Sequence, residues 1–108
     1  MIERIILFLL SLFGFRGAYF PDFDYIVCND VSTCIHEQGH RMDYALGLPS
    51  QTSEFKEAIS AFPFVLENNT CLVNTEMCKH KEAYAILWQA VEGSIYSLPE
   101  EFQQFYKE

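Results

Sequence analysis

The sequence predicts a single, mostly helical α+β domain with one small β-hairpin. A chain of 108 residues can bury one modest hydrophobic core, and half of these residues are hydrophobic. Two long segments carry apolar residues at helical spacing, whereas strand-forming residues gather in one short segment near residue 20. No repeat, low-complexity tract or linker divides the sequence, so we expect one domain over residues 1–108.

The N-terminal segment is almost wholly apolar from Ile5 to Phe15. It is short for a transmembrane helix, and it lacks a clean small-residue cleavage site. We favour a buried backing helix over residues 1–16, whose surplus apolar surface could mediate homodimerisation or membrane contact. The alternative is a signal segment or anchor over residues 1–17. The first interpretation favours a cytoplasmic protein, and the second a secreted or membrane-associated one.

The next segment predicts a β-hairpin with strands at about 17–20 and 24–29. Aromatic and β-branched residues give both stretches strand character, and Pro21 with Asp22 is a turn signal. The hairpin leads directly into a predicted helix over about 31–46.

That helix has clear signals at both ends. Asp30 is a good N-cap, and Gly47 followed by Pro49 predicts the C-terminal end. An apolar stripe within the helix predicts a buried face, and Gly39 lets another element approach closely. The apolar residues of this stripe are Ile35, Met42, Ala45 and Leu46.

The same helix carries His-Glu-Gln-Gly-His at residues 36–40. Residues four apart lie on one face of a helix, so His36 and His40 can bind one metal ion. Glu37 can then reach a water molecule at the metal, as zinc-assisted amide hydrolysis requires. The alternative is a surface helix with two solvated histidines.

Two further helices are predicted beyond this point. Ser50 and Ser53 are candidate caps for a helix over about 51–61, and Pro63 is expected to end it. Near the C-terminus, Pro99 opens a last helical turn or two. Three aromatic residues follow it: Phe102, Phe105 and Tyr106.

A long helix over about 75–96, capped by Asn74 or Thr75, offers a third metal ligand. Glu82 shares a helical face with the apolar residues three and six positions further on. A carboxylate on an apolar face is costly unless it is paired, and a zinc ion would satisfy it. The alternative is a solvated Glu82 beside Lys79 and Lys81.

These motifs resemble those of zincin metallopeptidases of the gluzincin type, in which a later helix adds a glutamate to the H-E-x-x-H helix. The short length and element order resemble the minigluzincins. Residues 36–43, with Glu82 and Ala85, are also similar to the motif of the anthrax lethal factor peptidase domain. The resemblance covers roughly residues 17–96 and implies a zincin-like minimal metallopeptidase domain.

The resemblance also implies roles for individual residues. His36, His40 and Glu82 would bind Zn²⁺, and Glu37 would be the general base that takes a proton from the attacking water. Asp43 would be a carboxylate that orients a ligand histidine. One strand of the hairpin could align the substrate as an added strand, or the hairpin could simply cover the core. Likewise, the C-terminal aromatic residues could fill the cleft of a latent enzyme or complete the core.

Two departures limit the resemblance. The third histidine of the metzincins is absent, so that branch is excluded. Lethal-factor-like relatives place an oxyanion-stabilising tyrosine where this chain has Thr75. Four residues could substitute for it: Tyr84, Tyr96, Tyr106 or His80.

The sequence therefore predicts a zinc metallopeptidase, in either an active or a latent form, that acts on a peptide or protein substrate. The alternative is a non-catalytic zinc-binding interaction or inhibitor module on the same scaffold. The net charge of −8 argues against nucleic-acid binding, because phosphates require a basic surface. The four cysteines leave two states open: disulfides between Cys28 and Cys34 and between Cys71 and Cys78 in an exported protein, or buried thiols in a cytosolic one.

Overall fold

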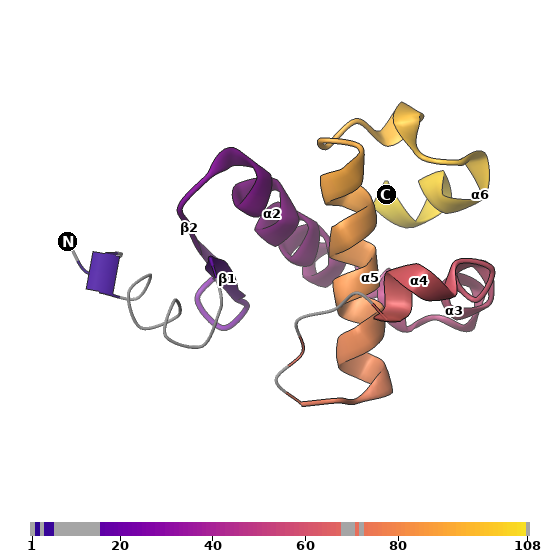
Figure 1. Ribbon diagram of the computed structural model, residues 1–108, viewed down its shortest axis with the longest axis horizontal. Coiled ribbons are helices and arrows are strands. Elements are labelled where there is room, and N and C mark those ends of the chain that lie inside the picture. The colour runs from indigo at the N-terminus through magenta and orange to yellow at the C-terminus, as the bar shows by residue number, and fades with distance from the viewer. Residues whose placement is uncertain (1, 3, 6–15, 68–70, 72, 108) are drawn as a thin grey trace.

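Two helices of 15 residues, α2 (Val31–Ala45) and α5 (Glu76–Ala90), pack against each other at the centre of the molecule (Figure 1). The computed structural model describes residues 2, 4–5, 16–67, 71 and 73–107. The other elements are β1 (Gly17–Phe20), β2 (Tyr25–Cys28), α3 (Ser53–Ile59), α4 (Pro63–Glu67), α6 (Glu100–Gln103) and the short 3-10 turns η1 (Pro49–Gln51), η2 (Ile95–Ser97) and η3 (Gln104–Tyr106). The hairpin packs on α2, while α4 packs on α5 and α3 on α6. This arrangement confirms the predicted mostly helical α+β class with a small hairpin.

The predicted backing helix over residues 1–16 falls mainly outside the described residues. The surface for dimerisation or membrane contact and the signal-segment alternative depend on the same region. Within the described part of the chain, none of the helices has the length and apolar character needed to cross a bilayer.

The hairpin forms as predicted, with β1 antiparallel to β2 and Gly17 paired with Cys28. The second strand begins at Tyr25 rather than at residue 24, because Asp24 has a positive φ of 49° and belongs to the turn. The Asp24 carboxylate accepts hydrogen bonds from Arg41 and from the Tyr19 hydroxyl. These bonds tie the hairpin turn to α2.

Helix α2 begins and ends where the sequence predicts. The Asp30 carboxylate accepts a hydrogen bond from the Thr33 backbone N–H at 2.8 Å, which satisfies a free donor of the first turn. Gly47, with φ of 84°, follows the last turn. The predicted apolar stripe is wrong at Ala45, which is exposed.

Gly39 lies where α2 crosses α5. A Cβ atom at Gly39 would come within 2.9 Å of the Ala85 Cα and 3.3 Å of the Trp88 Cβ. The absence of a side chain therefore lets the two helix backbones approach closely, as predicted.

The shorter helices depart from the predicted boundaries. The N-cap of α3 is Thr52, whose hydroxyl accepts from the Phe55 backbone N–H, rather than Ser50 or Ser53. Pro63 does not end α3, which ends at Ile59, before residue 61; it is instead the first residue of α4. A proline suits the first helical position, where no backbone donor is required.

Helix α5 is capped by Thr75, one of the two predicted caps, but ends at Ala90 rather than near residue 96. Glu92 and Gly93 both have a positive φ, 53° and 77°, which is incompatible with a continuing right-handed helix.

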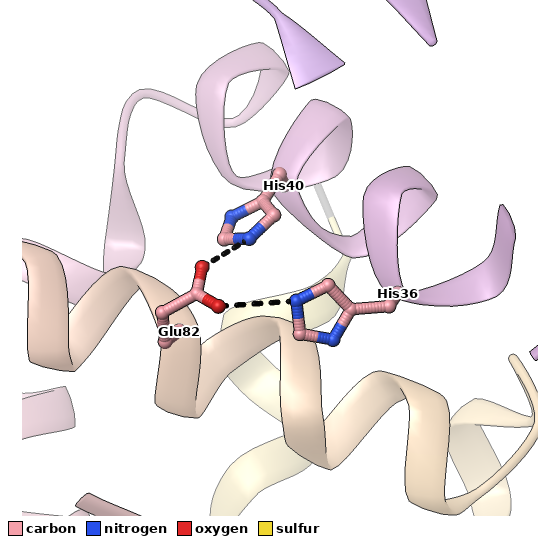
Figure 2. Close-up of side chains that lie close together, drawn as sticks. All are labelled: His36, His40 and Glu82. Atoms are coloured by element: carbon pink, nitrogen blue, oxygen red, sulfur yellow. Dashed lines mark hydrogen bonds and ion pairs between the residues drawn. The ribbon is translucent and has the colours of Figure 1, made fainter. Parts of the chain in front are cut away.

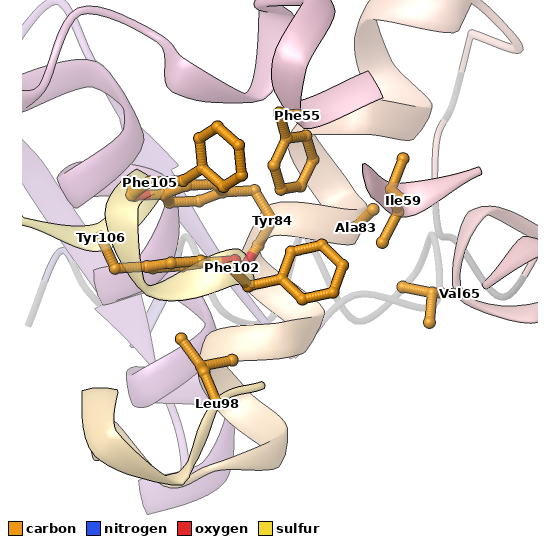
Figure 3. Close-up of a cluster of buried hydrophobic side chains, with 9 residues drawn as sticks. All are labelled: Phe55, Ile59, Val65, Ala83, Tyr84, Leu98, Phe102, Phe105 and Tyr106. Carbon is orange, nitrogen blue, oxygen red and sulfur yellow. Dashed lines mark hydrogen bonds between the residues drawn. The ribbon is translucent and has the colours of Figure 1, made fainter. Parts of the chain in front are cut away.

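The core contains the C-terminal aromatic residues (Figure 3). The Tyr106 ring stacks on Tyr84 with centroids 4.0 Å apart, and its hydroxyl donates to the Tyr84 carbonyl at 2.7 Å. The Tyr84 hydroxyl donates in turn to the Phe105 carbonyl. Phe55, Phe102 and Phe105 surround this pair. Of the two alternatives for the C-terminal aromatic residues, the structure has the one in which they complete the core.

All four cysteines are paired. One disulfide joins Cys28 at the end of β2 to Cys34 in the first turn of α2. The other joins Cys71, in the loop before α5, to Cys78 in the first turn of α5. Each bridge therefore anchors the start of one of the two central helices.

Candidate metal centre

The structure brings His36, His40 and Glu82 together between α2 and α5 (Figure 2). His36 Nε2 lies 3.3 Å from Glu82 Oε1, and His40 Nε2 contacts Glu82 Oε2. The potential ligand atoms all lie within 4.8 Å of one another, and the three side chains are only 12 to 14% exposed. The sequence predicted these three residues as one cluster, although the histidines and the glutamate are separated by more than 40 positions.

This donor set fits a zinc ion. Two imidazole nitrogens and one carboxylate oxygen are common zinc ligands, at about 2.0 to 2.2 Å from the metal. Ligand atoms of a tetrahedral site at that distance are roughly 3.4 Å apart. His36 Nε2 is 3.3 Å from the carboxylate, and no two potential ligand atoms are more than 4.8 Å apart, so side-chain movements of an ångström or so would admit an ion.

The electrostatics of the cluster fit a cation as well. Burial disfavours the charged form of Glu82, but hydrogen bonds with His36 and His40 outweigh it and hold the pKa of Glu82 well below its usual value. Burial likewise disfavours protonated His36, yet the Glu82 carboxylate outweighs it and raises the pKa of His36. The carboxylate therefore stabilises positive charge at the position between the rings, where a metal ion would bind.

Glu37 is buried and lines the same cavity as the three potential ligands. Burial raises the pKa of Glu37, although His40, His36 and the backbone N–H of Tyr19 all favour its charged form. The site therefore contains a carboxyl group with a raised proton affinity beside the potential ligands.

His36 has a hydrogen-bond partner that sequence reasoning missed. Its Nδ1 lies 2.8 Å from Gln89 Oε1, and the Gln89 Nε2 donates to the Ser32 hydroxyl at 2.7 Å. With its Nε2 bonded to Ser32, Gln89 presents Oε1 as an acceptor for Nδ1–H of His36, so Nε2 is the ring nitrogen that faces Glu82 and would bind a metal. The spacing of seven residues, two helical turns, from Glu82 to Gln89 was the available signal.

Asp43 was expected to orient a ligand histidine, but its carboxylate is bonded to Ser50. Its two oxygens accept from the Ser50 backbone N–H at 3.1 Å and from the Ser50 hydroxyl at 2.6 Å, rather than from a histidine. The side chain is fully buried, and burial raises its pKa. Asp43 therefore holds η1 against the end of α2.

A cavity of about 700 Å³ adjoins the cluster, and its walls are mainly apolar. Strand β1 forms one side, and residues before and within the first turns of α5 form another. Tyr44 and Lys81 also line it, and the Lys81 Nζ donates to the Tyr44 hydroxyl at 2.7 Å. Neither residue is predicted from the sequence, although Tyr44 lies one helical turn beyond His40.

The four suggested substitutes for an oxyanion-stabilising tyrosine do not line this cavity. Tyr84 and Tyr106 are buried in the core, and His80 is buried with its Nδ1 against the Glu76 carbonyl. Tyr96 is 83% exposed elsewhere. Thr75 does line the cavity, but its hydroxyl caps α5 by accepting from the Cys78 backbone N–H.

Comparison of the chain with protein-family models, with curated proteins and with solved structures found no match. The function of the site must therefore follow from its own residues.

Proposed function

We propose that this protein is a zinc-dependent metallopeptidase with a gluzincin-type site. In this proposal His36, His40 and Glu82 bind the metal, and Glu37 is the general base. The observation that carries it is the convergence of two imidazoles and a carboxylate from α2 and α5, with Glu37 buried on the same cavity wall. A purely structural zinc site has no need of a base at that position.

When bound, zinc lowers the pKa of a water molecule toward neutrality and polarises a carbonyl group. Glu37 accepts a proton from the water that attacks the peptide carbon, and then returns the proton to the leaving amine. Its raised pKa suits this exchange, because a catalytic acid or base works best when its pKa lies near the working pH. Gln89 keeps the Nδ1 proton of His36 away from the metal side of the ring.

Strand β1 gives this proposal a way to align a peptide. Gly17, Ala18 and Tyr19 line the cavity, and β1 pairs only with β2 among the described strands. An extended substrate could therefore add to the outer edge of β1 through main-chain hydrogen bonds. The contact of the Tyr19 backbone N–H with Glu37 links this edge to the general base.

The proposal is tested by measuring zinc content and peptide hydrolysis together. Elemental mass spectrometry of the wild type should give about one zinc per chain, and Glu82→Gln should lose most of it. Glu37→Gln should retain zinc but hydrolyse a peptide library roughly 10²- to 10⁴-fold more slowly than the wild type.

Glu76→Gln is the matched control, because Glu76 is on the same helix but exposed and outside the cluster. It should behave as the wild type in both measurements. A wild-type protein without zinc would overturn the proposal. A zinc-loaded wild type that cleaves no peptide would instead support the non-catalytic binding or inhibitor module.

A further inference from the structure

Lys81 lines a mainly apolar cavity, and its ammonium group is hydrogen-bonded to a neutral partner, the Tyr44 hydroxyl. Its Nζ donates to the Tyr44 hydroxyl at 2.7 Å and lies 4.8 Å from the centre of the Tyr44 ring. Three other cations in the described part of the chain do have carboxylate partners: Lys79 lies 3.7 Å from Glu76, Arg41 is paired with Asp24, and Arg16 lies 3.9 Å from Asp30. Among the described residues, the ion pairs within 4 Å do not include Lys81.

Asp43 is close enough to Lys81 to be affected by its charge, but it is hydrogen-bonded to Ser50 and not to Lys81. Lys81 acts electrostatically on Asp43, but both oxygens of that carboxylate accept hydrogen bonds from Ser50. A chain with 15 acidic and 7 basic residues offers many partners for a lysine. The Lys81 ammonium group lines the cavity but is in no ion pair with a described carboxylate. It is therefore suited to an anionic ligand, since a partly buried charge is stabilised by an opposite charge.

Tyr44 adds a second donor at the same place. Its hydroxyl oxygen accepts from Lys81, so its own hydrogen can be donated to a ligand. The Tyr19 ring packs against Tyr44 with centroids 5.7 Å apart and limits the movement of the phenol. One ammonium and one hydroxyl side by side match the two oxygens of a carboxylate.

We propose that Lys81 and Tyr44 form a subsite that binds a carboxylate group of the ligand, beside the His36–His40–Glu82 cluster. Lys81 directly precedes Glu82, and Tyr44 is one turn beyond His40, so the subsite adjoins the cluster on both helices. The carboxylate has two sources, an acidic side chain near the cleaved bond or the α-carboxylate of a peptide C-terminus. The position of this subsite relative to a cleaved bond rests on the proposed function, whereas its binding of a carboxylate does not.

Peptide binding tests the subsite without requiring turnover. Three short peptides of otherwise identical sequence are needed. The first is blocked at both ends and contains one glutamate, the second has glutamine in its place, and the third is the glutamine peptide with a free C-terminal carboxylate. Calorimetry with zinc-loaded Glu37→Gln protein should show at least one carboxylate peptide binding about 10-fold or more tightly than the neutral peptide. The first and third peptides distinguish the two sources.

Variants then assign the effect to Lys81. Lys81→Met, in the same background, should reduce binding of the preferred peptide to that of the neutral peptide, and Tyr44→Phe should weaken it. Lys79→Met removes the same charge from the same helix but lies outside the cavity, so it should keep the preference. Lys81→Arg should also keep it, which guards against a misfolded Lys81→Met protein.

Equal binding of the three peptides, no binding of any of them, or a preference that survives Lys81→Met would overturn the subsite. The same peptides incubated with wild-type protein separate this result from the proposed function. Carboxylate-dependent binding without hydrolysis would contradict the peptidase proposal alone, and hydrolysis that ignores the carboxylate would contradict the subsite alone.

Discussion

The Gln89 side chain is bonded to His36 on the side of the ring away from Glu82, so it would orient this histidine in the proposed metal site without binding the metal itself. It connects the His36 ring to Ser32, so that one residue of α5 holds two residues of α2. Partners of this kind typically contribute 10- to 100-fold to metal affinity, because they fix the tautomer and the angle of the ring.

We therefore expect Gln89→Leu to lower zinc affinity by about 10- to 100-fold, measured by competition with a chelator. Gln89→Glu keeps an acceptor at this position and should retain most of the affinity. Gln38→Leu is the control, because Gln38 is exposed on α2. Equal zinc affinity in wild type and Gln89→Leu would show that His36 needs no such partner.

Asp43 gives a prediction for the pH dependence of stability. Burial raises its folded-state pKa above the ordinary value of 3.8. A group with a raised folded pKa stabilises the fold at pH values below its unfolded pKa, and this contribution is lost as the pH rises through the folded pKa. Asp43→Asn has no such loss. The free energy of unfolding of the variant, measured with urea, should therefore increase relative to the wild type as the pH rises from about 4 to 7. A difference that is constant over this range would contradict this account.

At the level of elements, the contact between α2 and α5 sets the geometry of the candidate metal site, because His36 and His40 lie on one helix and Glu82 on the other. Their separation is set where Gly39 lies against Ala85. A change in this separation moves Glu82 relative to His36 and His40. Helix packing and metal geometry therefore depend on the same contact.

Gly39→Ala tests this dependence. In an isolated helix the change should stabilise by about 1 kcal/mol. Here the new Cβ would meet backbone at 2.9 Å, so the helices must move apart, and we expect a net loss of roughly 1 to 3 kcal/mol in the free energy of unfolding. Zinc affinity should fall as well. Gln38→Ala, one position away and exposed, should change neither quantity much. A Gly39→Ala protein with wild-type stability and zinc affinity would show that the contact can relax.

The elements that the sequence predicted correctly are those with local causes. Asp30 caps α2 through the residue three positions later, and Gly47 ends it through its own φ. The histidine pair follows from helical spacing alone. The end of α5 was predicted near residue 96, whereas the positive φ at Glu92 and Gly93 ends the helix at Ala90.

The residues that were missed interact across the two helices. Tyr44 with Lys81, and His36 with Gln89, become neighbours only once α2 and α5 have a defined rotation about their axes. No spacing within one segment encodes that rotation. The hydrogen bond between Ser50 and Asp43 also depends on tertiary structure, because it requires a particular path of the chain after α2. Since the Ser50 hydroxyl is bonded to Asp43, it does not cap α3 as the sequence suggested.

For the whole molecule, the C-terminal segment is part of the core rather than an appendage. Phe102, Phe105 and Tyr106 are at most 7% exposed, and they cover the side of α5 that carries Tyr84. Burying such side chains contributes roughly 1.5 to 3 kcal/mol each, a large share of the 5 to 15 kcal/mol that stabilises a typical domain.

A chain that ends at Leu98 should therefore lose its cooperative thermal unfolding transition, measured by circular dichroism, instead of gaining activity. A chain that ends at Tyr106 retains these aromatic residues and should unfold as the full-length protein does. Tyr106→Phe keeps the ring but loses the hydrogen bond to the Tyr84 carbonyl, at a cost of about 1 kcal/mol. A folded and more active Leu98 truncation would instead support a latent enzyme.

The two disulfides have a consequence for how the chain reaches its native state. Their cysteines are six and seven positions apart, so each bridge closes a short loop that requires no tertiary contact. The crossed pairings would have to close much longer loops, and each doubling of loop length costs about 0.6 kcal/mol more in chain entropy. During oxidative refolding, the native pairs are therefore favoured while the chain is still extended. We therefore expect the starts of both helices to be covalently fixed before α2 and α5 pack, and the proposed metal site between them to form afterwards.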